Sequence, residues 1–200
     1  MPDSREVAVT AVMAAATAAT TMLIVIPFAP TRGFFNIGDA MVMLAGLVFG
    51  ARVGFLAGGI GSALADILLG YGFFAPLTLF IKGMEGYVVG YIGRGRGPFY
   101  RVAAVLAGAA VMMAGYFTVE WVILSFEVAL AEMLTVNSLQ VGFGAVISLA
   151  VWGLLRKTYP ALEHYKYSTS SRREALAMGL AAIILLGIVS AIYTAFGVMG

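Results

Sequence analysis

The sequence has no cysteine, one histidine and few charged residues. Without cysteine the chain offers no disulfide and no thiolate metal site, and His164 alone supplies little for a transition-metal centre. Charged residues make up 11% of the 200 residues, hydrophobic residues make up 62%, and the mean hydropathy is +0.98. Because a soluble domain carries about 25% charged residues, this composition predicts an integral membrane protein.

Apolar runs follow one another along most of the chain, and we expect each to form a helix. The runs lack the alternation of a membrane β-barrel, and backbone groups in lipid must pair within their own segment. Several runs fall short of the roughly 20 residues of a full crossing, so kinked or partial spans are expected. The fold class is therefore all-α, with runs at 7–26, 37–50, 53–70, 76–93, 102–124, 138–155 and 175–196.

Motifs for ATP hydrolysis and for enzyme chemistry are missing from the sequence. Residues 93–97 read G-R-G-R-G and lack the Lys-Ser/Thr ending of a phosphate-binding loop. There is also no H-E-x-x-H and no G-x-S-x-G motif, so we expect no catalytic residue, cofactor or metal. If transport is active, another chain must hydrolyse the ATP.

Positive charges lie almost entirely on one side of the predicted topology. With the N-terminus in the cytoplasm, Arg32 alone falls in an outer loop and Lys82 lies inside a helix. This asymmetry is what the positive-inside rule requires, and the net charge of +2 then gives no argument for nucleic-acid binding. The ten remaining basic residues are Arg5, Arg52, Arg94, Arg96, Arg101, Arg156, Lys157, Lys166, Arg172 and Arg173.

Polar residues at membrane depth gather in the outer half of the bundle. At 1.5 Å per residue, Asp39 and Asp66 lie about 5–6 Å below the outer edge, and Lys82 and Glu85 about 9 and 14 Å deep. Ionisable groups at such depth are costly and point to a ligand site, with Lys82 and Glu85 as its floor. The candidate substrate-binding residues are Asn36, Asp39, Asp66, Lys82, Glu85, Glu120, Asn137 and Gln140.

The same residues also fit a purely structural role. Lys82 and Glu85 are spaced i,i+3 and could form an ion pair within one helix, so whether Lys82 touches the ligand or only neutralises Glu85 stays open. As a set they favour a pocket, because buried pairs stabilise a fold only weakly. Aromatic residues that border this region suit a planar polar ligand, or else form an interfacial belt: Phe34, Phe35, Tyr71, Phe73, Phe74, Tyr116 and Trp121.

Small residues form stripes on three of the predicted helices. Gly83, Gly86 and Gly90 share one face of run 76–93, and run 53–70 carries a similar stripe, which predicts close helix packing. The first run instead carries an alanine ridge that serves either internal packing or the docking of a partner membrane subunit: Ala11, Ala15 and Ala19.

The stretch F-N-I-G-D-A-M-V-M-L-A-G-L-V-F-G-A-R-V-G, continuing to A-P-L-T-L-F-I-K-G-M-E-G-Y-V-V-G, resembles a known family. It is similar to the substrate-binding S components of energy-coupling factor (ECF) vitamin transporters, in particular the riboflavin-transporter-like branch. The segment N-S-L-Q-V-G-F-G-A-V-I resembles the start of that family's last core helix, and the alanine ridge resembles its A-x-x-x-A docking face.

The resemblance implies a six-helix bundle with a vitamin pocket near its outer face, in a complex with a membrane T component and two ATPases. Riboflavin is the first expected substrate, followed by hydroxymethylpyrimidine or thiamine and by pyridoxine. Alternatives are an autonomous proton-coupled transporter of a small polar solute and a non-transport membrane subunit.

The domain prediction is a six-helix substrate-binding domain over 1–157, a basic cytoplasmic linker over 158–174 and an additional helix within 175–200. The family pattern ends with the sixth helix, so we expect the extra helix to pack outside the core. The whole protein is predicted to be a multi-pass protein of the plasma membrane.

Overall fold

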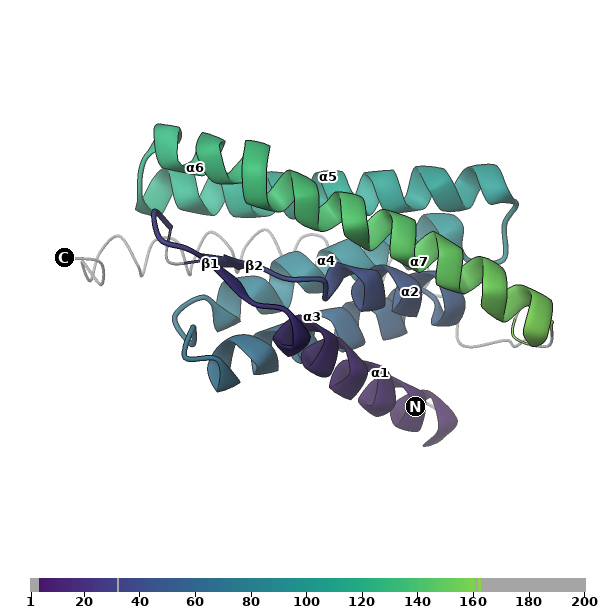
Figure 1. Cartoon of the computed structure of the whole chain (residues 1–200). Coiled ribbons are helices and arrows are strands. Elements are labelled where there is room, and N and C mark those ends of the chain that lie inside the picture. The colour runs from purple at the N-terminus through teal and green to yellow at the C-terminus, as the bar shows by residue number, and fades with distance from the viewer. Residues whose placement is uncertain (1–3, 32, 161, 163–200) are drawn as a thin grey trace.

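The computed structural model describes residues 4–31, 33–160 and 162, and these form a helical bundle (Figure 1). Four helical segments are long and apolar enough to cross a membrane, and α2 is a shorter apolar helix. The all-α membrane architecture is therefore confirmed. The helices are α1 (Ser4–Leu23), α2 (Asp39–Phe49), α3 (Ala51–Leu68), α4 (Ala75–Gly93), α5 (Pro98–Ile123), α6 (Phe126–Glu132) and α7 (Ser138–Thr158).

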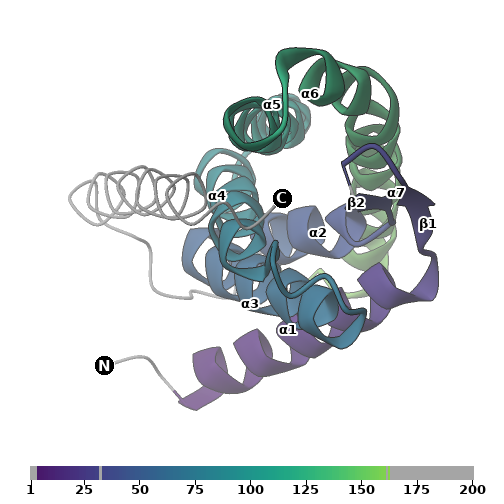
Figure 2. The ribbon, with the colours of Figure 1, turned by 90° about the vertical axis from the view of Figure 1, so that its left-hand side faces the viewer.

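Helix α4 lies at the centre of the packing, between α3 and α5, and α2 crosses it to reach α7 (Figure 2). The main apolar core lies between α2, α4, α5 and α7, where Met43, Leu77, Ile81 and Met112 are almost fully buried. Helix α1 packs mainly on α3, at the side of the bundle. The polar residues of α2 and α4 are thereby enclosed by helices on several sides.

The glycine stripes bring α2, α3 and α4 into backbone contact. A side chain added at Gly54 would meet the backbone of Gly86, and one at Gly90 would meet the backbone at Gly50 and Ala51. Gly50 has φ +96°, which only glycine adopts readily, and this conformation makes the one-residue turn between α2 and α3. The predicted role of these small residues in close packing is confirmed.

Two elements differ from the sequence prediction. Between the first two apolar runs, where no element was predicted, β2 (Gly33–Phe35) pairs antiparallel with β1 (Ile26–Phe28). The segment between the fifth and sixth runs forms α6, which begins where the Ser125 hydroxyl accepts a hydrogen bond from the Val128 amide, and a π-helical turn, Met133–Asn137. Together with α7 these form one continuous helical stretch.

The other expected runs match helices to within a few residues at each end. The predicted linker over 158–174 and the extra helix over 175–196 lie almost entirely outside the described residues.

Candidate ligand site

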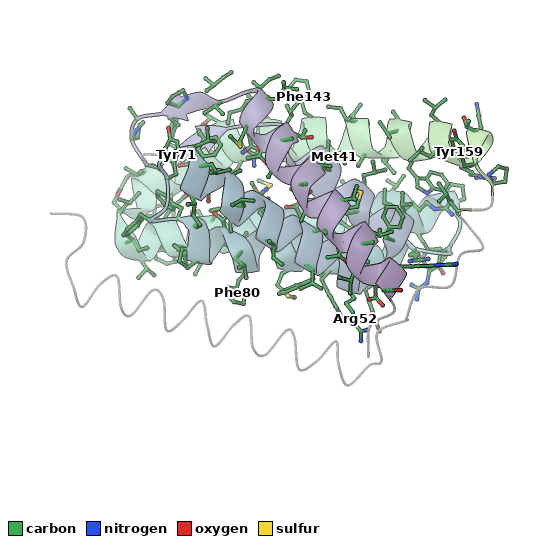
Figure 3. All side chains as sticks on the ribbon, turned by 90° about the horizontal axis from the view of Figure 1, so that it is seen from below. Met41, Arg52, Tyr71, Phe80, Phe143 and Tyr159 are labelled. Atoms are coloured by element: carbon green, nitrogen blue, oxygen red, sulfur yellow. The ribbon has the colours of Figure 1, made fainter. Side chains whose placement is uncertain are left out.

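The candidate site lies where several helices begin or end at the same end of the bundle. This end carries the start of α4, the end of α3 and α5, the β1–β2 hairpin and α6, whereas α2 begins further toward the middle of the molecule (Figure 1). Figure 3 shows Tyr71, beside this end of α3, far from Tyr159 at the other end of the molecule. The predicted polar residues therefore come from separate segments that the fold brings to one end.

Lys82 is the centre of a buried ionic cluster. Its Nζ atom donates hydrogen bonds to Asp39 Oδ1 and to Glu85 Oε2, the latter at 3.2 Å. All three side chains are buried, with Asp39 and Glu85 at 0% exposure. The ion pair predicted within α4 from the i,i+3 spacing forms, and Lys82 also links α4 to α2 through Asp39. Such a cluster needs further polar partners to offset the cost of desolvating its charges.

An amide network extends the cluster to α7 and to the loop before α2. Gln140 Nε2 donates to both oxygens of Asp39, at 3.3 and 3.4 Å, and Gln140 Oε1 accepts from the backbone and side-chain nitrogens of Asn36, each at 3.1 Å. The side-chain oxygen of Asn36 accepts from the Gly38 amide at 2.8 Å, which fixes the turn into α2. The network therefore holds α2, α4 and α7 in register around the site.

A cavity of about 50 Å³ opens beside this network. The volume suffices for a few water molecules, so a vitamin-sized ligand requires side chains or the surrounding loops to move outward. Most of the lining residues carry polar side chains, and four of them are aromatic. The lining residues are Thr21, Gly33, Phe34, Asn36, Ser62, Asp66, Tyr71, Phe74, Thr78, Lys82, Tyr116, Glu120, Glu132, Asn137 and Gln140.

Six of the eight predicted site residues line the cavity, and two lie behind its wall. Asp39 and Glu85 are not among the lining residues, because both are buried against Lys82. Asp39 therefore lies beside Lys82, although its predicted depth at the start of α2 had put it closer to the outer rim of the pocket than Lys82. Helix depth gives the level of a residue in the membrane but not the direction of its side chain.

The aromatic residues divide in a similar way. Phe34, Tyr71, Phe74 and Tyr116 line the cavity, and the Phe34 and Tyr71 rings lie 4.6 Å apart. Lys82 Nζ lies 5.8 Å from the centre of the Tyr116 ring. Three of the predicted aromatic residues do not line the cavity, and their rings pack on other aromatic rings: Phe35 on Phe143, Phe73 on Phe74, and Trp121 on Phe117 and Phe126.

Glu132 is a lining residue that the sequence reading missed. It lies at the end of α6, in a segment that had been treated as a connection, and it is 5% exposed. Glu132 lines the same cavity as Glu120. The sequence did offer a signal for Glu132 as a site residue, since it lies five residues before Asn137 in an otherwise apolar helical stretch.

Several buried polar atoms in this region have no hydrogen-bond partner among the described residues. They include three carboxylate oxygens, Glu85 Oε1, Glu120 Oε2 and Glu132 Oε2, and one amide donor, Asn137 Nδ2. Leaving such atoms unpaired costs about 1–3 kcal/mol each, and more for a charged group. A bound ligand that supplies mainly N–H or O–H donors would offset this cost. Across the described part of the chain, no group of three or more His, Asp and Glu side chains is arranged for a metal ion.

The alanine ridge of α1 faces away from the bundle. Ala11, Ala15 and Ala19 are exposed, whereas α1 buries the opposite face through residues such as Met13 and Thr17. Internal packing of the described bundle therefore does not account for the ridge.

Comparison with known proteins places the chain in a transporter family. The family described as "ECF-type riboflavin transporter, S component" matches residues 3–157, which include α1 to α6 and all of α7 except its last residue. An uncharacterized protein in the gap 3′ region of Pyrococcus woesei is 40% identical over 146 residues, covering 72% of this chain and 97% of that protein. The thiamine precursor transporter HmpT of Lactococcus lactis is 29% identical over 120 residues, covering 60% of this chain and 68% of its own length.

The family match agrees with the resemblance seen in the sequence. The bundle and its polar cavity both lie within the matched residues. This chain belongs to the family of S components of ECF-type riboflavin transporters.

Proposed function

We propose that this chain captures a vitamin precursor of the aminopyrimidine type on the outer side of the plasma membrane. A membrane T component and two ATPases would then drive its uptake. The distribution of Lys and Arg supports a cytoplasmic N-terminus, and in that orientation the cavity faces outward. The autonomous proton-coupled transporter is not favoured, because the chain belongs to a family of S components.

The observation that carries the substrate class is the excess of acidic groups in the site. Asp66, Glu120 and Glu132 line the cavity, whereas Lys82, the one cation among the described lining residues, already binds two further carboxylates. A ligand with amino groups or a positive charge pairs with such carboxylates through strong charge-assisted hydrogen bonds. An aminopyrimidine offers an exocyclic amine and basic ring nitrogens, and its flat ring fits beside Phe34 and Tyr71.

Riboflavin, the first substrate expected from the sequence, matches this wall less well. Its ring system is neutral and presents mainly hydrogen-bond acceptors with a single imide N–H. Its ribityl hydroxyls are neutral donors, which form weaker hydrogen bonds to carboxylates than a protonated ring or amine does. The similarity to a relative named as a thiamine precursor transporter supports the same preference. The proposal that the chain binds a vitamin or its precursor does not depend on whether the ligand is riboflavin or an aminopyrimidine.

A tryptophan-fluorescence titration of the purified protein tests the proposal. We expect hydroxymethylpyrimidine to bind with a sub-micromolar Kd and riboflavin to bind at least about tenfold more weakly, which corresponds to about 1.4 kcal/mol. Pyridoxine provides a second basic ring for comparison. Tighter binding of riboflavin would reject the substrate class, and no sub-micromolar ligand in the panel would reject the S-component function.

A further inference from the structure

A second cavity, of about 340 Å³, lies at the end of the bundle opposite the candidate ligand site. It is bordered by the α4–α5 turn, by the ends of α2 and α7, and by Leu162 just beyond α7. Figure 1 shows the α4–α5 turn and the end of α7 together at one end of the molecule, away from the β-hairpin and α6. We call this space the arginine cavity, because Arg94, Arg96, Arg101 and Arg156 all line it.

The arginines of this cavity are held by aromatic rings and by the backbone. Arg101 is 5% exposed, and its Cζ atom lies 3.6 Å from the centre of the Trp152 ring, with Arg156 on the same ring at 5.6 Å. Arg96 stacks 5.4 Å from the Tyr100 ring. Stacking uses the face of a guanidinium group, whereas bidentate hydrogen bonds to an oxyanion use its N–H edge.

The turn between α4 and α5 is built to carry two of these side chains. Gly95 has φ +67°, a left-handed conformation that lets the chain reverse between Arg94 and Arg96. Arg94 donates a hydrogen bond to the Phe49 carbonyl, which ties the turn to the end of α2. The α4–α5 turn therefore has a fixed geometry at the mouth of the cavity.

We propose that the arginine cavity binds a phosphate group. Four guanidinium groups from three segments border a space large enough for a phosphate, and none of the described lining residues carries a carboxylate. Arginine clusters of this kind match the planar, bidentate geometry of phosphate recognition. The cavity lies at the helix ends that carry the basic loops, on the side predicted to face the cytoplasm, where anionic lipid headgroups are found, and a soluble phosphate reaches the same place. This proposal does not rest on the identity of the vitamin.

The two tryptophans of the chain allow a direct test. Trp152 lies in the cavity wall and Trp121 lies near the opposite end, so Trp121→Phe leaves Trp152 as the only indole. This variant in phosphatidylcholine nanodiscs is titrated with inorganic phosphate against sodium chloride at equal ionic strength. In parallel, native mass spectrometry measures the retention of phosphatidylglycerol against phosphatidylcholine.

A saturable change in Trp152 emission with phosphate identifies a soluble ligand, whereas selective retention of phosphatidylglycerol identifies a lipid headgroup. Arg96→Gln and Arg156→Gln, at exposed positions that do not threaten folding, should each weaken the observed binding about tenfold or more. Lys157→Gln is the matched control, because it removes the same charge from the next residue, which is outside the cavity wall. An equal loss in Lys157→Gln would overturn the proposal in favour of nonspecific charge attraction.

Two further results would also overturn it. The first is the absence of both the phosphate response and the selective lipid retention. The second is binding of phosphate or lipid that appears only in the Glu163→Gln variant. In that case the natural occupant of the cavity would be the carboxylate of Glu163, which follows Leu162 in the chain. A vitamin titration of the same preparations separates these outcomes from a failure of the proposed function.

Discussion

Lys82 determines the electrostatic balance of the candidate site. Replacing it by methionine keeps much of the side-chain volume but leaves Asp39 and Glu85 buried without their cation. Breaking a buried ion pair on one side costs about 3–5 kcal/mol, so we expect Lys82→Met to lower the melting temperature sharply and to weaken vitamin binding. The double variant Asp39→Asn with Lys82→Met should regain part of the stability. Equal stability of wild type and Lys82→Met would contradict an essential role for this cluster.

Substitution of Glu132 distinguishes a contact with the ligand from a contact that only stabilises the fold. One of its carboxylate oxygens is buried without a hydrogen-bond partner among the described residues, so replacing the carboxylate by the neutral amide of Glu132→Gln should leave the melting temperature unchanged or raise it. Loss of a charge-assisted hydrogen bond to the ligand should weaken binding by about tenfold or more.

Glu127→Gln is the control for this prediction, because Glu127 lies on the same helix and is exposed. The two variants are compared by calorimetric titration with the vitamin and by thermal melting. Destabilisation by Glu132→Gln with unchanged affinity would assign Glu132 to the fold and not to the ligand.

At the scale of single elements, α3 and α4 depend on their glycines for contact. An alanine at Gly86 would press its methyl group into the backbone of Gly54, so we expect Gly86→Ala to lower thermal stability despite the better helix propensity of alanine. Gly142→Ala on α7 is the matched control, because a side chain there meets no atom within 4 Å. It should be neutral or stabilise by up to about 1 kcal/mol. Similar melting temperatures for both variants would reject the close contact.

The alanine ridge of α1 provides a second test at this scale. Ala15 is exposed, so a tryptophan there leaves the bundle intact but blocks close approach of a partner helix. We expect Ala15→Trp to bind the vitamin normally and to lose uptake in cells that express the complete transporter. Ala150→Trp, at an exposed position on α7, should retain both activities. Loss of binding in Ala15→Trp would show that the ridge is not a separate docking face.

The positions of the long helices could be predicted from the sequence, whereas the arrangement of side chains in the site could not. Apolar runs locate membrane helices well because lipid requires every backbone group to be paired within its segment. The three-residue strands and the seven-residue α6 are too short for such a signal, and Glu132 was missed with them. Depth along a helix correctly grouped Lys82 with Asp66 and Glu120 at one end. It gave no side-chain direction, and therefore did not distinguish Asp39, behind the wall, from Asn36, within it.

The whole molecule has two polar ends of opposite character. One end holds the acidic cavity with its buried carboxylates, and the other holds the arginine cavity. In the proposed orientation the acidic end collects a basic, water-soluble ring from outside, and the basic end faces the cytoplasm with its partners. Uptake should therefore require co-expression of the T component and the ATPases.

The central claim is that the acidic cavity of this S component holds an aminopyrimidine. Native mass spectrometry of the purified protein, before and after addition of hydroxymethylpyrimidine, tests it most directly. The account predicts one bound pyrimidine per chain, either co-purified or after addition, and its loss in Glu132→Gln. A bound flavin that hydroxymethylpyrimidine does not displace, or a chain that stays unliganded at saturating hydroxymethylpyrimidine, would contradict the account.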